Sequence, residues 1–406
     1  MASTTAQPNR GSGRDATDRV VVVGGGVEGL SIAHGLARRG VEVVLCERSE
    51  LASGGTGKSS GVVRAHYGVA SLAAMAWIGV QALERGVEEL GHDVGFVQTG
   101  YVVGVGPDDV AALQANVAMH QGLGVDVELV DHDAVAGQWP GTELDDFAAF
   151  AHEPRGGHGD AHSTALAYAH AARRAGATIR PHTPVVALET AGDRVVGVAL
   201  ADGTTVAADL VVVAAGAWSV PLCAQVGVDL PIRAQREQIM LVDPGRDLGE
   251  VPVLSDLVSL QYVRAERDGS LLVGNSDHSA PDYVDVDRYR NQVDDAYVER
   301  AAAKIQARFP GLDPALKGGY SGCYDVTPDF NPIIDLPGPD GLLVAAGFSG
   351  HGYKISPAVG ELVADLVIAG ASRHPDVVAA DFRLDRFALG RPLTSEHPYR
   401  QAGQMR

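Results

Sequence analysis

Residues 19–47 read RVVVVGGGVEGLSIAHGLARRGVEVVLCE. The opening apolar run ends in three glycines, which is typical of a short strand buried on both faces of a parallel sheet. The next segment places Leu30, Ala33 and Leu36 at helical spacing, and Gly40 marks its end. The run VEVVLCE then predicts a second parallel strand. Together these segments predict a strand–helix–strand unit.

The glycines of this unit satisfy the dinucleotide-binding pattern G-x-G-x-x-G, between a predicted strand and a predicted helix. Gly24 permits the tight turn, Gly26 lets backbone approach a pyrophosphate, and Gly29 allows close packing of helix on strand. The helix N-terminus faces the phosphates with its partial positive charge. Glu47, 18 residues after Gly29, can accept hydrogen bonds from ribose hydroxyls. The pattern itself leaves NAD and FAD open. The contacts predicted for this unit are Gly24, Gly26, Val27, Glu28, Gly29 and Glu47.

Two later segments, 208–218 and 341–350, are also short apolar runs that end in small residues. We expect three distant parts of the chain to supply one parallel sheet, whose carboxyl ends meet at a ligand. Segments 95–106 and 259–277 instead alternate and carry hairpin signals, with Asp268-Gly269 in a tight turn. These segments predict antiparallel sheet. The interleaving of the two kinds of segment predicts two domains threaded through each other.

Bulk properties exclude several classes of protein. The 406 residues are 46% apolar and 20% charged, as in ordinary soluble globular proteins, and suffice for two domains. A net charge of −19 argues against nucleic acid or an anionic membrane as partner. The three cysteines are far apart, which excludes a disulfide framework and leads us to expect a cytoplasmic protein. Residues 1–18 predict a disordered leader and not a signal peptide, and no apolar run is long enough to span a membrane.

The loop ELASGGTGKSSGVVRAHYG, at 50–68, contains the end of a nucleotide-triphosphate loop pattern in Gly57, Lys58 and Ser59. That pattern requires a glycine five residues before Gly57, where this chain has Ala52. The preceding strand-like run also ends several residues too early. A kinase or ATPase site is therefore excluded, and the loop needs another explanation.

A set of segments resembles the flavoprotein family of D-amino acid, glycine and sarcosine oxidases. The matching segments are the opening unit, the loop at 50–68, AHSTALAYAHAARRAGATIRPHTPVVALE (161–189), VVVAAGAWS (211–219), YDVTPDFNPII (324–334) and GFSGHGYKISPAVGELVADLV (347–367). They span almost the whole chain after the leader. The resemblance implies FAD as cofactor, and the second dinucleotide fingerprint expected of flavin enzymes that also bind NAD is absent. It also implies an α/β chain (α+β overall) with a Rossmann-type FAD-binding domain and an interleaved substrate domain built on an antiparallel sheet. The expected FAD-binding domain comprises 19–93, 151–228 and 326–390; the substrate domain comprises 94–150 and 229–325; a tail follows at 391–406.

The resemblance also assigns cofactor contacts. The loop after the second strand wraps the pyrophosphate and the flavin edge in this family, so Ser60, Gly61 and Val62 are expected to meet cofactor through backbone groups. We interpret Lys58 either as a phosphate partner or as a solvated loop residue. The remaining contacts that the resemblance implies are Arg48, Val185, Ala215, Gly216, Trp218, Gly347, Ser349, Gly350, Gly352 and Lys354.

Four residues are implied to act on substrate. Arg64 and Lys354 match positions that grip the substrate carboxylate in sarcosine oxidases, and a carboxylate handle calls for buried cations. Tyr324 matches an active-site tyrosine, and His351 matches a position beside the flavin. We expect a helix to begin at Ser356-Pro357, since serine caps and first-turn prolines favour helix starts. The direction of Tyr262 stays open, and His66 and Tyr67 could either line the pocket or cap the next helix.

These features predict FAD-dependent oxidation of the C–N bond of a small amino acid, or of an N-methyl or secondary amino acid, to an imine that water hydrolyses. Oxygen is the expected acceptor, giving hydrogen peroxide. One alternative is a dehydrogenase that passes electrons to a quinone or partner subunit, because the segment 254–266 offers only arginine where sarcosine oxidases have an oxygen-activating lysine. Another is a flavin-binding subunit without activity of its own.

We expect FAD to be bound noncovalently. Monomeric sarcosine oxidases attach it through a cysteine whose position is Gly322 here, and the neighbouring Cys323 is one residue out of register on a strand, which points it to the opposite face. No metal is expected, because the spacing of His152, His158 and His162 fits no common zinc pattern.

Overall fold

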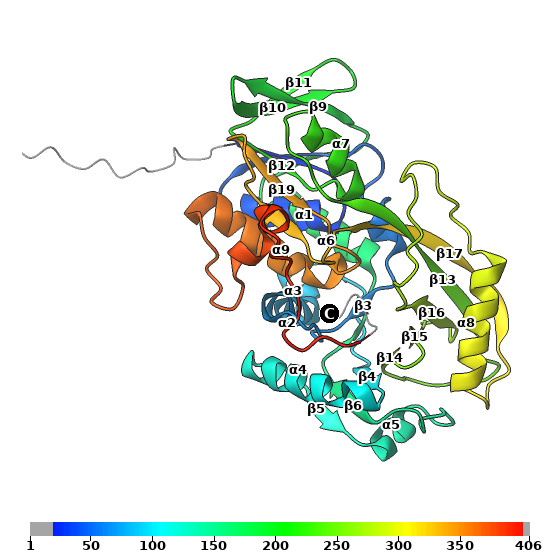
Figure 1. The fold of residues 1–406 in the computed structure, drawn as a ribbon. Helices are drawn as coiled ribbons and strands as arrows, with labels where there is room; N and C mark the ends of the chain where they lie inside the picture. The colour runs from blue at the N-terminus through cyan, green and yellow to red at the C-terminus, as the bar shows by residue number, and fades with distance from the viewer. Residues whose placement is uncertain (1–18, 401–406) are drawn as a thin grey trace, which may run out of the picture.

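The computed structural model describes residues 19–400, so the predicted leader at 1–18 and the last residues of the predicted tail lie outside the described part (Figure 1). A six-stranded sheet forms one half of the molecule, in the strand order β18-β19-β12-β1-β2-β8. All its pairings are parallel except β18 with β19. Its strands are β1 (Arg19–Val23), β2 (Glu42–Cys46), β8 (Thr178–Arg180), β12 (Leu210–Val213), β18 (Ile333–Asp335) and β19 (Leu342–Ala346).

The three distant glycine-tipped segments therefore do form one sheet, as predicted. β1 lies between β12 and β2, with Val20 opposite both Leu210 and Val43. Alternate residues of β1 face two different cores, because successive side chains of a strand point to opposite faces. Val20 and Val22 pack with the helices, whereas Val21 and Val23 pack against a small second sheet.

Helices cover the first face of the six-stranded sheet. They are α1 (Val27–Ala37), α6 (Ala161–Arg174) and α9 (Gly352–Ala369), and behind them α2 (Ala70–Glu84) packs on α9 and α3 (Gly86–Leu90) packs on α6. α1 packs between α6 and α9. The other face carries α7 (Ser219–Ala224) and a three-stranded antiparallel sheet of β9 (Val185–Ala191), β10 (Arg194–Leu200) and β11 (Thr205–Ala207). This arrangement is the Rossmann-type half of the predicted fold.

An eight-stranded sheet forms the other half, in the order β17-β13-β16-β15-β14-β4-β6-β5 (Figure 1). Its strands are β4 (Tyr101–Val105), β5 (Glu128–Val130), β6 (Ala149–Glu153), β13 (Arg233–Asp243), β14 (Val253–Asp256), β15 (Gln261–Ala265), β16 (Leu271–Asn275) and β17 (Ala315–Val326). β15 and β16 form the predicted hairpin, with Gly269 at φ +79° in its turn. The sheet is antiparallel apart from the pair β14 and β4, which is parallel.

Three further helices complete this half, and several short elements are distributed over both halves. The helices are α4 (Val110–Gly122), α5 (His132–Gln138) and α8 (Asp295–Arg308). The short elements are β3 (Val62–Val63), which pairs with β7 (Gly157–His158), the helix α10 (Asp385–Ala388), and the 3₁₀ turns η1 (Gly55–Lys58), η2 (Pro107–Asp109), η3 (Gly216–Trp218) and η4 (Ala379–Phe382). No helix within residues 19–400 combines the length and the apolar character needed to cross a bilayer.

The predicted helix start at Ser356-Pro357 is wrong, because α9 already begins at Gly352 and Pro357 lies inside it. A proline there cannot donate to the carbonyl of Tyr353, four residues earlier. The Ser356 hydroxyl donates to that carbonyl instead, at 2.9 Å. A local side-chain bond thus compensates the missing backbone bond and lets the helix continue.

The domain limits remain predictions, and two places show how the chain crosses them. β6 runs through the predicted limit at 150/151 and pairs on both sides with strands of the eight-stranded sheet. The segment 391–400, shown in red in Figure 1, runs over α4, where the Asn116 side chain donates to the His397 carbonyl. Most of the segment is exposed, but its Tyr399 is 2% exposed and anchors it to the protein.

Candidate active site

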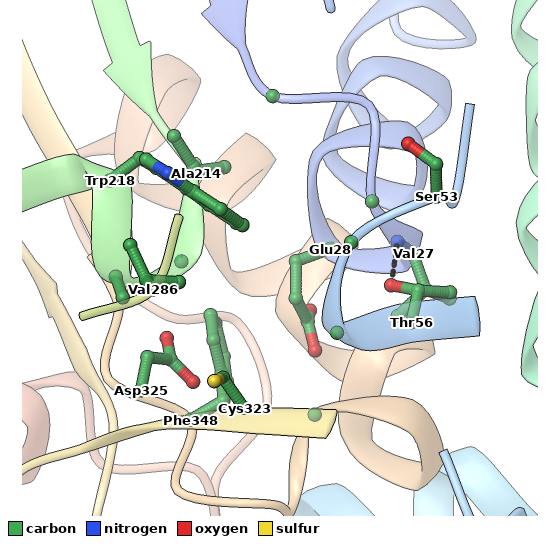
Figure 2. A pocket seen from close by; sticks show the side chains of 18 of the residues that line it. Val27, Glu28, Ser53, Thr56, Ala214, Trp218, Val286, Cys323, Asp325 and Phe348 are labelled. Atoms are coloured by element: carbon green, nitrogen blue, oxygen red, sulfur yellow. Dashed lines mark hydrogen bonds between the residues drawn. The ribbon is translucent and has the colours of Figure 1, made fainter. Parts of the chain in front are cut away.

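A cavity of about 860 Å³ opens at the carboxyl ends of β1, β2 and β12 (Figure 2). This volume lies in the upper part of the roughly 300–1,000 Å³ range of ligand pockets. Its position fits the rule that open parallel sheets bind ligands beyond the carboxyl ends of their strands. The residues with a predicted cofactor role that line it are Gly24, Gly26, Val27, Glu28, Glu47, Arg48, Ser60, Val62, Val185, Ala215, Gly216, Trp218, Gly350, Gly352 and Lys354.

The glycine-rich turn after β1 has the geometry that its pattern predicts. Gly24 has φ +112°, and a Cβ there would lie 2.4 Å from the Ala214 oxygen. A Cβ on Gly29 would lie 2.0 Å from the Gly24 oxygen, so Gly29 serves the contact between helix and turn and does not line the cavity. The first turn of α1 therefore starts directly at the cavity wall.

The loop at 50–68 closes over the start of α1. The Val27 amide, in the first turn of that helix, donates to the Thr56 hydroxyl at 3.0 Å, as Figure 2 shows. Glu47 is fixed in the same way: its carboxylate accepts from the Gly25 amide at 2.7 Å and from the Ser49 amide at 2.8 Å. Thr56 gave no signal in the sequence, because its role depends on a contact across the loop.

A polar cluster stands at the mouth of the cavity. The Arg48 guanidinium lies 4.0 Å from the centre of the Trp218 ring, and it pairs with Asp287 at 3.1 Å. Trp218 donates its indole N–H to the same carboxylate at 2.9 Å. Asp287 belongs to the loop before α8 and was not predicted, although Arg48 and Trp218 were. The two halves of the molecule therefore meet at this rim.

Two buried acids lie across the cavity from each other. Glu28 is 8% exposed, and neither of its carboxyl oxygens has a hydrogen-bond partner among residues 19–400. Burial, then the nearby Asp325, raises the pKa of Glu28 well above its usual range, although Lys354 opposes this. Burial also raises the pKa of Asp325, whose carboxylate accepts from the Gly347 amide at 2.7 Å. Figure 2 shows both carboxyl groups directed into the same space.

A smaller chamber of about 50 Å³ adjoins the large cavity and shares Ser60, Val62, Tyr324, Gly350 and Lys354 with it. Arg64 lies in its wall, so the structure brings together Arg64, Lys354 and Tyr324 as predicted neighbours. Tyr262, whose direction the sequence left open, also lines it. The lining residues that the sequence did not indicate are Tyr101, Ser255, Leu257 and Ser276.

Tyr67 contacts both of the basic residues of this chamber, Arg64 and Lys354. Arg64 is 5% exposed, and its guanidinium lies 4.1 Å from the centre of the Tyr67 ring. Lys354 donates to the Tyr67 hydroxyl at 3.1 Å. Burial, followed by the Arg64 charge, holds the pKa of Lys354 well below its usual range. This shift favours the neutral amine. It indicates that the described residues of the chamber provide no negative charge that would balance a protonated Lys354 beside Arg64.

His351 does not line either space. It is 1% exposed, and its Nδ1 lies 3.1 Å from the Tyr67 hydroxyl. Burial, then the charges of Lys354 and Arg64, holds the pKa of His351 well below its usual range. The hydrogen bond to Tyr67 therefore connects His351 to the residues of the chamber, and its position beside the flavin stays a prediction.

Three more predicted residues shape backbone and do not line a cavity. Gly61 has φ +69°, and a Cβ there would lie 2.0 Å from the Gly159 oxygen. Gly347 has φ +76°, and the Ser349 hydroxyl accepts from the Thr327 amide at 3.2 Å.

Lys58, by contrast, lines the large cavity, and its amine lies 5.9 Å from the centre of the Tyr320 ring.

Cys323 lies in the wall of the large cavity. It pairs across the sheet with Arg236, whereas Gly322 and Tyr324 pair with the residues on either side of Arg236. Its side chain therefore points to the other face of β17. Burial raises the pKa of this thiol to about 11, and a hydrogen bond with Tyr289 opposes this.

Comparisons with known proteins agree with this geometry. Residues 19–366 match the family model described as FAD dependent oxidoreductase. Monomeric sarcosine oxidase of Bacillus sp. (strain NS-129) is 29% identical, over 91% of this chain and 97% of its own length. The 4-methylaminobutanoate oxidase (formaldehyde-forming) of Paenarthrobacter nicotinovorans is 30% identical over 87% of this chain, which spans only 44% of that enzyme. Among solved structures, L-proline dehydrogenase from P. horikoshii superposes with a TM-score of 0.84, at 25% identity and with 93% of this chain and 99% of that one covered.

Proposed function

Since this chain belongs to the family of FAD-dependent oxidoreductases, we propose that it oxidises the C–N bond of a small amino acid, or of an N-methyl or secondary amino acid, to an imine. Water then hydrolyses the imine to an amine and a carbonyl compound. Oxygen is the proposed acceptor, and it leaves as hydrogen peroxide.

The large cavity suits a dinucleotide along its whole length. Gly24 and Gly26 let backbone approach a pyrophosphate, and Glu47 stands at the end of β2 where ribose hydroxyls would lie. The carboxyl of Glu28, which has no hydrogen-bond partner among the described residues, offers further hydrogen bonds within the same cavity. When bound, the flavin supplies a two-electron acceptor for the hydride equivalent that leaves the carbon next to nitrogen.

The observation that carries the proposal is the position of Arg64 and Lys354 together in the small chamber. Both side chains are at least nine-tenths buried, and they come from chain segments almost 300 residues apart. A buried pair of this kind lacks an anion, and a substrate carboxylate would supply it. A carboxylate between them would also favour the protonated form of Lys354, because an opposite charge favours the charged form of its neighbour.

The other lining residues restrict the substrate. Tyr324, Tyr262 and Tyr101 enclose the chamber with large rigid rings, which exclude water and leave room for a small molecule only. Fixing the carboxylate at one end places the neighbouring carbon and nitrogen at the opening towards the large cavity. This positioning converts the encounter into an intramolecular step.

One observation favours the alternative of a dehydrogenase. Arg264, the only basic residue of β15, donates its Nε–H to the Ser60 carbonyl at 2.6 Å and also contacts His158 and Glu266. These hydrogen bonds occupy its guanidinium and connect β15 to the loop at 50–68. A cation for the reaction with oxygen would have to come from elsewhere in the chamber.

The test is an anaerobic titration of the FAD-loaded protein with glycine, sarcosine, proline and N-methyl amino acids, followed by flavin absorbance. We expect bleaching by at least one compound that carries both a carboxylate and an amine. Admission of air then distinguishes the acceptors: rapid recovery of colour with peroxide supports an oxidase, and slow recovery that an added quinone accelerates supports a dehydrogenase. If none of these compounds bleaches the flavin, the proposed substrate class is wrong.

A further inference from the structure

Three buried side chains converge at a second place, next to Arg64 and outside the lining of both cavities. They are His66 from the loop after β3, His120 from α4 and Glu153 from β6, with exposed fractions of 0%, 0% and 3%. Their ligand atoms all lie within 4.8 Å of one another. The histidines that the sequence singled out as metal candidates, at 152, 158 and 162, are not part of this group.

Each of the three side chains uses one polar atom for an orienting bond. The Nε2–H of His120 donates to the Tyr67 carbonyl at 2.7 Å, and the Nε2 of His66 lies 2.7 Å from the Tyr399 hydroxyl. One oxygen of Glu153 accepts from the Ala65 amide at 2.8 Å. Metal-binding histidines are held in this way, by a bond from the ring nitrogen that does not face the metal.

The second polar atom of each side chain is buried. These atoms are the Nδ1 of His66, the Nδ1 of His120 and the Oε1 of Glu153, and none has a hydrogen-bond partner among residues 19–400. A fully buried polar atom without a partner costs about 1–3 kcal/mol. Three such atoms on three neighbouring side chains, two of them 3.7 Å apart, indicate that something belongs there.

We propose that His66, His120 and Glu153 bind one divalent transition-metal ion of the zinc class. Two imidazoles and one carboxylate form a known zinc ligand set that leaves a fourth position open, and imidazole ligands favour zinc, cobalt or nickel over magnesium and calcium. With zinc–ligand bonds of about 2.0–2.2 Å, tetrahedral ligand atoms stand about 3.4 Å apart. The Nδ1 of His66 and the Oε1 of Glu153 are 3.7 Å apart, and all three ligand atoms lie within 4.8 Å of one another, so binding requires the side chains to close in by up to about 1.4 Å (4.8 minus 3.4).

A buried water molecule is the competing occupant. With Nε2–H donated to Tyr67, the Nδ1 of a neutral His120 carries a lone pair, and so does that of His66 when Tyr399 accepts its Nε2 proton. When Glu153 is ionised, a water molecule, which has two protons, cannot donate to three lone pairs, whereas one cation satisfies all three. The metal is therefore the better match to this set of acceptors.

The proposed ion would tie together parts of the chain that surround the small chamber. Its ligands come from three separate elements, and Tyr399 adds the C-terminal segment through His66. The Arg64 guanidinium donates to the carbonyl of His66 itself. The ion would thus stabilise the wall that holds Arg64, and this role is independent of any redox chemistry at the flavin.

The experiment uses the full-length protein with its purification tag removed. Metal content is measured by mass spectrometry after purification, and chelator-treated protein is then titrated with Co²⁺ while its visible spectrum is recorded. We expect one equivalent of metal per chain and the intense absorption of four-coordinate cobalt with nitrogen and oxygen ligands. Thermal unfolding should occur at a higher temperature with Zn²⁺ than with chelator.

Two variants make the assignment specific. His120→Gln should lose the bound metal and the effect of Zn²⁺ on unfolding. His170→Gln should keep both, and it removes a surface histidine whose ring lies 4.4 Å from that of His92, where adventitious metal could bind. Wild-type protein that binds neither Zn²⁺ nor Co²⁺ would overturn the proposal on its own, whether or not the His120 variant folds. Equal metal content in wild type and the His120 variant, with loss in the His170 variant, would also overturn it.

Discussion

Substitution of Gly79 by alanine tests the packing that carries Lys354 into the small chamber. Gly79 lies in α2, and a Cβ added to it would stand 1.7 Å from the carbonyl oxygen of Lys354, in the first turn of α9. Real Cβ contacts essentially never fall below 3.0 Å, so the helices must separate by at least 1.3 Å (3.0 minus 1.7). The clash is with backbone, and no rotamer change can relieve it.

The size of the effect follows from two opposed contributions. Overpacking of this kind costs about 1–3 kcal/mol, and a backbone clash belongs at the upper end. Alanine in place of glycine in a helix contributes about 1 kcal/mol in the other direction. We therefore expect Gly79→Ala to lower the free energy of unfolding by about 2 kcal/mol, and to weaken carboxylate binding because the first turn of α9 moves.

The assay is urea unfolding followed by circular dichroism, at one fixed FAD concentration for all variants. Gly137→Ala is the matched control, because Gly137 also lies in a helix, α5, and an added Cβ there meets nothing within 4 Å. This control should be as stable as wild type or more stable, by up to about 1 kcal/mol. A Gly79→Ala protein at least as stable as wild type would refute the packing argument.

Three further predictions concern the site. Arg64→Ala should weaken the binding of carboxylate substrates by about 2–4 kcal/mol, since it removes one partner of a buried charged pair, and Arg267→Ala in the exposed hairpin turn should leave kcat/KM unchanged. A carboxylate inhibitor without an amine should bind more weakly as the pH rises above the lowered pKa of Lys354, because the free protein then lacks a proton that the complex holds. If a Lys354→Met protein shows the same dependence of affinity on pH, Lys354 is not the group responsible. Acid precipitation of the holoprotein should release all flavin into the supernatant, because Gly322 stands where the linking cysteine would be and burial raises the pKa of the Cys323 thiol, which lines the large cavity, to about 11. Yellow protein in the pellet would contradict noncovalent binding.

Much of the fold was predictable, because its decisive signals are local. Apart from Arg19 at the start of β1, the runs at β1, β12 and β19 are apolar, and each ends in or is followed by small residues, so each predicts a buried parallel strand by itself. The parallel pair of β14 with β4 carries no such signal, since the partners are about 150 residues apart and either would suit an antiparallel neighbour equally well. The early start of α9 was missed because Ser356 looks like a helix cap, whereas it bonds the carbonyl that Pro357 leaves unpaired.

The site divides in the same way. Residues that act through backbone shape, such as Gly24 and Gly29, follow from a spacing pattern, because their role is set within a few neighbours. Thr56 and Asp287 act through contacts across loops, and their residue types are common in any loop. No spacing rule reaches such pairs. They become visible only when the chain brings the two halves of the cavity together.

The charge state of the chamber is the property furthest from the sequence, and it bears most directly on function. Two cationic side chains were expected there, but two buried positive charges without an anion would repel each other at a high desolvation cost. Burial and Arg64 hold the pKa of Lys354 well below its usual range, which reduces the positive charge on its amine. The amine donates a hydrogen bond to the Tyr67 hydroxyl. An arriving carboxylate reverses both causes, since it covers the amine with an opposite charge and offsets the field of Arg64. On the proposed function, we therefore expect the chamber to gain a proton together with its ligand, and we expect selectivity for acids to depend on that coupling and not on the number of cations alone.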